Sequence, residues 1–123
     1  MQVKFINKPI IEPVDDECWR LMTDFYVEVD GLPYTVETGF VTDGASIPRF
    51  LWRLCGHPMS TKRLPAAVFH DWLYDHPLTF TRADADAIYR DGLIALGFSR
   101  FKANLEYYAL RLFGGSHYNK ENT

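Results

Sequence analysis

The sequence predicts an α+β fold, in which a small N-terminal antiparallel β-sheet precedes three to four helices. In the first third of the chain, apolar and polar residues alternate, as they do in half-buried strands. The pair Asp30-Gly31 separates two of these runs and is a strong signal for a tight hairpin turn. Farther along, apolar residues recur at helical spacing between residues that cap or stop helices. Since strands come first and helices follow, the pattern favours α+β over alternating α/β.

The N-terminal runs give the expected strands and their connections. The first strand carries Pro9 near its far end, which confines that end to the edge of a sheet because proline cannot donate to a strand ladder. Val3, Phe5 and Ile10 are expected to face inward. The strands and the turn are predicted over Met1–Ile11, Trp19–Val29, Asp30–Pro33 and Tyr34–Thr42.

Helices are predicted from residue 49 onwards. Thr81 and Ser99 are expected to cap two of them, while His76-Pro77 and the glycines at 97 and 114–115 end the helices before them. The expected helices are Arg49–Cys55, Pro65–Asp75, the segment from Thr81 to Leu96, and Arg100–Phe113.

The last predicted helix carries apolar side chains along one side. Phe101, Leu105, Tyr108 and Leu112 recur at helical spacing. This pattern predicts that the stripe packs into the core.

Length and composition indicate one globular domain over residues 1–115, followed by a polar and loose tail, 116–123. Of the 123 residues, 47% are hydrophobic and 24% are charged, and the net charge of −3 includes no run of like charges. No nucleic-acid partner is therefore expected.

The apolar runs are too short to span a bilayer, and the N-terminus does not resemble a signal peptide. Cys18 and Cys55 are expected to be reduced and buried.

The most informative stretch is the apolar helix around His70-Asp71, with Tyr74 one turn beyond His70. Neighbouring residues point about 100° apart on a helix, so His70 and Asp71 face two sides of one candidate site. His70 is a candidate general base and Asp71 a candidate ligand for a hard cation. The alternative is that His70 is a core histidine whose ring nitrogens form hydrogen bonds with neighbouring residues.

A histidine base works best when a carboxylate orients its other ring nitrogen. The next helix offers Asp84 and Asp86. Asp84 already has the role of capping-box partner to Thr81. Asp86 borders the apolar side of its helix and is therefore the candidate for His70; the alternative is an exposed ion pair with Arg90.

Asp43, in the turn Asp43-Gly44-Ala45-Ser46, is a second candidate cation ligand. The alternative is that Asp43 or Ser46 caps the short helix that follows.

Two stretches together resemble a family of small proteins of tailed bacteriophages and prophages that has no assigned function. They are Gly39–Pro48, containing TDGASIP, and Ala66–Tyr74, containing HDWLY; Arg82 and Ala85–Tyr89 extend the likeness, which covers roughly residues 20–115. The resemblance implies a viral or prophage origin.

The pattern His70-Asp71-x-x-Tyr74, followed by Asp86 on a second helix, is also similar to the active-site helices of phospholipase A2, above all the parvovirus capsid form. The resemblance implies that His70 activates water, Asp71 binds calcium, Asp86 orients His70 and Tyr74 donates a supporting hydrogen bond. The glycine-rich calcium loop of that family is poorly matched by Leu54–Pro58, and Asp43-Gly44 is too distant to be its equivalent.

Three functions remain open from the sequence. The first is a calcium-dependent hydrolase of lipid esters that acts on a phospholipid membrane surface. The second is a virion protein, for example of the tail, that binds other virion proteins, and the third is an inhibitor of a host defence factor. Each implies location in the host cytoplasm during infection or in the virion.

Overall fold

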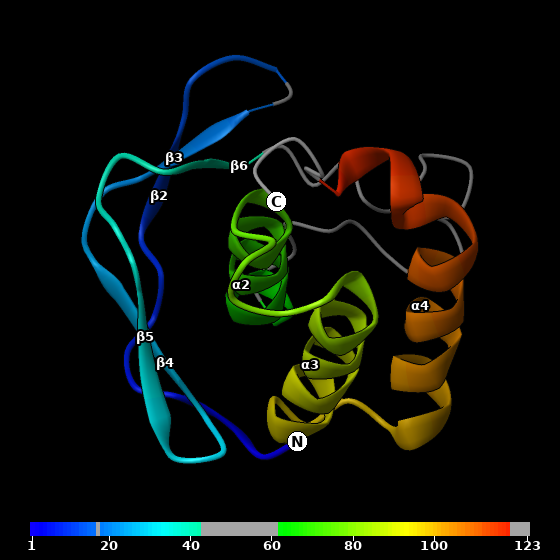
Figure 1. Ribbon diagram of the computed structural model, residues 1–123. Helices are drawn as coiled ribbons and strands as arrows, with labels where there is room; N and C mark the ends of the chain where they lie inside the picture. The colour runs from blue at the N-terminus through cyan, green and yellow to red at the C-terminus, as the bar shows by residue number, and fades with distance from the viewer. Residues whose placement is uncertain (17, 43–61, 119–123) are drawn as a thin grey trace.

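A computed structural model describes residues 1–16, 18–42 and 62–118, and its strands lie on one side of its helices (Figure 1). It has N-terminal antiparallel strands followed by helices, so the predicted α+β class is confirmed. The strands are β1 (Val3–Phe5), β2 (Ile11–Pro13), β3 (Trp19–Leu21), β4 (Phe25–Val29), β5 (Leu32–Val36) and β6 (Val41–Thr42). The helices are α2 (Leu64–Asp75), α3 (Arg82–Ala95), α4 (Arg100–Phe113) and the 3-10 turn η2 (Gly114–His117). The predicted helix Arg49–Cys55 lies outside the described residues.

The strands form two three-stranded antiparallel sheets, ordered β1-β4-β5 and β2-β3-β6. The hairpin between β4 and β5 turns at Asp30-Gly31, as predicted, and both residues adopt positive φ angles (51° and 83°). Glycine adopts this conformation without a steric penalty, which is why such pairs favour the turn.

Each long predicted strand is divided between the two sheets, so the predicted boundaries were wrong. Asn7 interrupts the first strand because its side chain accepts a hydrogen bond from the backbone N–H of Tyr26 and donates one to the carbonyl of Asp24. The Asp24 side chain accepts hydrogen bonds from both the backbone N–H and the hydroxyl of Thr38, which interrupts the third. Ile10, expected to face inward, is 56% exposed.

The core lies between the sheets and α2, and it continues between α2, α3 and α4. Strand residues such as Phe25, Val27 and Val36 pack with Phe69 and Leu73 of α2. On the other side, small residues of α2 pack with Tyr89 and Leu93 of α3 and with α4. Helix α2 is therefore buried on most of its circumference, at the centre of the molecule (Figure 1).

The expectation that the α4 stripe packs into the core was wrong. Phe101, Tyr108 and Leu112 are 79%, 61% and 75% exposed. Helix α4 instead buries Ala103, Glu106, Ala109 and Leu110. The small residues allow α3 and α4 to approach closely, and the buried Glu106 has a cation partner, Arg63.

Candidate functional site

Helix α2 places the His-Asp motif where two helices meet. It begins at Leu64, with Pro65 in the first turn where a missing N–H has no cost, and it ends before Pro77. A short connection leads to α3, whose N-cap Thr81 accepts a hydrogen bond from the backbone N–H of Asp84 at 3.1 Å. Thr81 therefore caps α3 as predicted, and it is Asp86, further along α3, that meets His70.

His70 and Asp86 form a buried pair. His70 Nε2 lies 2.8 Å from Asp86 Oδ1, and the two side chains are 2% and 0% exposed. The hydroxyl of Tyr74 donates a second hydrogen bond to the same carboxylate oxygen. The rings of His70 and Tyr74, one helical turn apart, have centroids separated by 4.2 Å. The structure thus brings together the three residues predicted to be catalytic.

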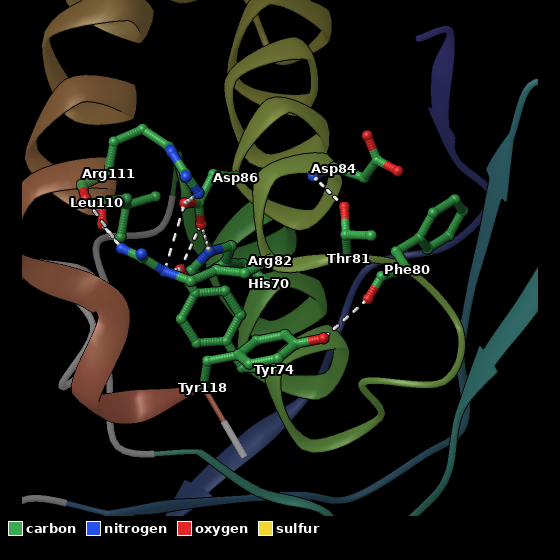
Figure 2. Close-up of polar contacts among 10 residues, drawn as sticks. All are labelled: His70, Tyr74, Phe80, Thr81, Arg82, Asp84, Asp86, Leu110, Arg111 and Tyr118. Carbon is green, nitrogen blue, oxygen red and sulfur yellow. Dashed lines mark hydrogen bonds and ion pairs between the residues drawn. The ribbon is translucent and has the colours of Figure 1, made fainter. Parts of the chain in front are cut away.

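Two arginines complete the surroundings of Asp86, and Figure 2 shows both beside it. Arg111 of α4 donates a hydrogen bond from Nη1 to Asp86 Oδ2 at 2.9 Å. Arg82 Nε lies 4.0 Å from the same oxygen, while its Nη2 donates to the carbonyls of Leu110 (2.6 Å) and Arg111 (3.0 Å). The C-terminal turn of α4 is therefore tied directly to the His-Asp pair.

These contacts make Asp86 an ionised carboxylate at neutral pH. Burial raises its pKa, but the hydrogen bond and charge of His70, together with the hydrogen bonds from Tyr74 and Arg111, outweigh burial and lower the pKa. Burial and the hydrogen bond to Asp86 raise the pKa of Tyr74, which stays a neutral donor.

The ionised Asp86 also determines the tautomer of His70. A carboxylate only accepts hydrogen bonds, so Nε2 must carry the hydrogen and a neutral His70 has its lone pair on Nδ1. Nδ1 makes no hydrogen bond to the residues that the structure describes. This is the arrangement that a carboxylate-oriented general base requires.

Asp71 belongs to a different environment from His70. It is half-buried and accepts a hydrogen bond from the hydroxyl of Thr42 in β6. Asp43, the other predicted cation ligand, follows Thr42 in the sequence and lies outside the described residues. Within residues 1–16, 18–42 and 62–118, no three His, Cys, Asp or Glu side chains are grouped to hold a metal ion.

The alternative for Asp86, an exposed ion pair with Arg90, is not observed, because Asp86 is buried and Arg90 Nε lies 3.2 Å from Asp91 Oδ1. Two expectations about neighbouring residues need correction. Tyr118, in the tail that was expected to be loose, packs edge-on against Tyr74 and donates to the carbonyls of Pro77 and Phe80. Cys18 is half-buried rather than buried, while Cys55 lies outside the described residues.

A second buried polar cluster lies beside the first and was not predicted. Arg63 Nη2 donates to Glu106 Oε2 at 2.6 Å, and the Tyr89 hydroxyl donates to Glu106 Oε1 at 2.8 Å. The Tyr89 and His70 rings are 5.2 Å apart between centroids. Since Arg63 and Glu106 are 43 residues apart, no local sequence pattern indicates the pair.

The part of the chain that the structure describes contains no helix with both the length and the apolarity needed to cross a membrane.

Comparisons with known proteins identify relatives without an assigned activity. Residues 19–110 match the family described as "Protein of unknown function (DUF1353)". Two relatives from Sinorhizobium fredii (strain NBRC 101917 / NGR234) are the uncharacterized proteins y4iH and y4jT. They are 36% and 33% identical over 103 and 97 residues, or 83% and 78% of this chain. The chain spans 43% and 29% of their lengths. No solved structure matches it significantly.

Proposed function

The chain belongs to the DUF1353 family of unknown function, and we propose that it is a hydrolase in which His70 acts as a general base oriented by Asp86. The observation that carries the proposal is the hydrogen bond between His70 Nε2 and an ionised, fully buried Asp86. It leaves Nδ1 as the ring nitrogen that accepts a proton. Tyr74 and Arg111 hold the carboxylate in place.

In this proposal, Nδ1 of His70 removes a proton from a water molecule while the water oxygen attacks an ester carbonyl. The imidazolium that forms keeps its Nε2–H bonded to Asp86, whose negative charge stabilises it. When the ester C–O bond breaks, His70 returns the proton to the leaving alcohol. The products are a carboxylic acid and an alcohol, so the base is regenerated.

The proposed substrate is a lipid ester, with a phospholipid membrane as its source. The support is the similarity of His70-Asp71-x-x-Tyr74 and Asp86 to phospholipase A2, since His70, Tyr74 and Asp86 meet here in one hydrogen-bonded group. A bacteriophage or prophage origin, and action in the host cytoplasm or from the virion, are part of the same proposal.

Asp71, with Asp43, would hold a calcium ion, which takes six to eight oxygen ligands. The donor chemistry fits, because Asp71 and the Thr42 hydroxyl that it contacts both present oxygen atoms. Calcium, when bound, would polarise the ester carbonyl.

The test is fatty-acid release from phospholipid vesicles, with calcium and with a chelator, by wild type and by His70→Gln. The proposal predicts calcium-dependent release that falls about 10²–10⁴-fold in His70→Gln, the usual contribution of a general base. Thr38→Val, a change away from the site, serves as a matched control. Full activity of a folded His70→Gln protein would remove His70 as the base.

The burial of this group favours a second candidate, a non-catalytic virion or assembly protein. His70, Tyr74 and Asp86 are all at most 2% exposed. In this role the hydrogen bonds would fix α2, α3 and α4 relative to one another, and no substrate would reach Nδ1. This candidate predicts no ester hydrolysis under any condition, together with co-sedimentation with purified phage particles. Inhibition of a host defence factor stays a prediction of the sequence alone.

A further inference from the structure

The outward side of α4 is an exposed apolar stripe. Its most exposed members, Phe101, Tyr108 and Leu112, share one side of the helix with the half-buried Leu105. At 1.5 Å per residue the stripe runs for roughly 16 Å. Phe113, at its end, is 43% exposed. Single exposed apolar residues are ordinary, but a continuous stripe of large ones indicates a contact surface.

The charged residues beside the stripe are all basic. Arg100 and Lys102 lie near its first turn and Arg111 near its last. The one acidic residue of α4, Glu106, is fully buried against Arg63. The solvent-facing part of α4 therefore combines aromatic and leucine side chains with positive charge and carries no negative charge.

We propose that the outward side of α4 binds the surface of an anionic lipid bilayer. A helix with Phe and Leu on one side and Lys or Arg beside them is suited to the boundary between headgroups and acyl chains. Helix α4 lies at the outer edge of the molecule, opposite the strands (Figure 1). Phe101, Tyr108 and Leu112 line neither the hollow beside Phe5 and Leu64 nor the hollow beside Val3 and Asp91. An outward ridge of this kind suits a flat surface.

A second copy of the chain is a poorer occupant of this surface. Arg100 and Arg111 lie on the same flank of the stripe, so in an antiparallel pair of α4 helices centred on it, Arg100 of one copy would face Arg111 of the other. Like charges placed opposite one another weaken such an interface. An anionic surface, in contrast, attracts Arg100 and Lys102 at the start of the stripe, while Arg111 at its end already compensates the charge of Asp86.

The choice of lipid rests in part on the proposed lipid-ester hydrolysis, but binding requires no turnover. Vesicle binding without hydrolysis would support this inference and contradict the proposed hydrolase activity. Hydrolysis of a soluble ester without vesicle binding would support the hydrolase activity and contradict this inference.

The test is flotation of the full chain with phosphatidylcholine vesicles, with and without phosphatidylglycerol. We expect binding to the anionic vesicles, weakened by added salt, and a loss of about tenfold or more in affinity for Phe101→Ser/Leu112→Ser. Leu32→Ser/Leu78→Ser is the matched control, because Leu32 and Leu78 are also exposed (61% and 82%) but lie elsewhere. Arg100→Gln should weaken binding about fivefold.

Three outcomes would overturn the proposal. The first is no binding by the wild type, and the second is equal loss of binding in the α4 variant and the control. The third is a concentration-dependent dimer, measured by sedimentation, that Phe101→Ser/Leu112→Ser abolishes, because the stripe would then be an interface between copies.

Discussion

At the scale of single residues, Asp86 determines the properties of the candidate site. An isolated buried carboxylate would be strongly destabilising. Here Oδ1 accepts from His70 and Tyr74, and Oδ2 accepts from Arg111. The charge is therefore compensated from two other helices, and its position is fixed by four side chains when Arg82 is included.

Asp86 is expected to make stability depend on pH. Its pKa is lowered on folding from the ordinary value of 3.8, so the unfolded state binds its proton first. The stabilisation is fully present above that ordinary value and is lost as the pH falls through the folded pKa. The wild-type free energy of unfolding, from urea titrations, should therefore fall below about pH 5.

In Asp86→Asn, the free energy of unfolding should no longer show the decrease at acid pH that Asp86 causes, whatever the stability of the variant at neutral pH. Asp84→Asn, on the same helix, is the control and should retain it. Equal slopes of unfolding free energy against pH in wild type and Asp86→Asn would show that Asp86 is not the group responsible.

The sequence was sufficient for part of the site. Tyr74 lies one turn from His70, and a short connection between helices brings Asp86 opposite them, so local spacing predicts the three together. Arg111 was missed because it is 25 residues from Asp86 and no repeating pattern joins them. The general rule that a buried carboxylate needs cations does not say which arginines supply them.

At the scale of elements, the contact of α3 with β1 depends on a glycine. A Cβ added at Gly92 would lie 3.0 Å from Phe5 Cζ and 3.5 Å from the Ala66 Cβ. Alanine gains about 1 kcal/mol in helix propensity over glycine. Overpacking typically costs about 1–3 kcal/mol.

We expect Gly92→Ala to destabilise the wild type by about 1 kcal/mol, because the contact with the Phe5 ring outweighs the propensity gain. In a Phe5→Leu background, which removes that ring contact, the same change should stabilise the protein. Urea unfolding of the wild type, Gly92→Ala, Phe5→Leu and the double variant measures the effect of Gly92→Ala in both backgrounds. Stabilisation of similar size in both backgrounds would show that Phe5 does not restrict Gly92.

Elements were predicted more reliably than the faces that they bury. The helix caps at Thr81 and Ser99 are local, and both are observed. The alternation of apolar and polar residues continues through the positions where the strands break. It therefore did not reveal that the side chains of Asn7 and Asp24 replace backbone hydrogen bonds between strands. In α4, periodicity identified an apolar side, but the buried side contains Glu106, whose partner Arg63 is distant in sequence.

At the scale of the whole molecule, two buried polar clusters join helices α2, α3 and α4, while apolar packing joins α2 to the sheets. The Arg63–Glu106 pair links the start of α2 to the middle of α4, and Tyr89 of α3 donates to the same carboxylate. The His70–Asp86 group links the same helices farther along α2.

Glu106→Gln should destabilise the protein by about 3–5 kcal/mol, because it breaks the buried ion pair between Glu106 and Arg63. Arg63→Met/Glu106→Leu, which removes both charges, should recover much of that loss. Thermal and urea unfolding measure both variants. A double variant less stable than Glu106→Gln would show that the pair itself is strongly stabilising.

The most direct test of the His70–Asp86 assignment is the ring tautomer of His70, measured by ¹⁵N NMR at neutral pH. A neutral His70 that donates from Nε2 to Asp86 should show a protonated Nε2 and an unprotonated Nδ1. Asp86→Asn should change that signature, while Asp84→Asn should not. A hydrogen on Nδ1 in the wild type would contradict the proposed base, because the nitrogen assigned to accept a proton from water would already carry one.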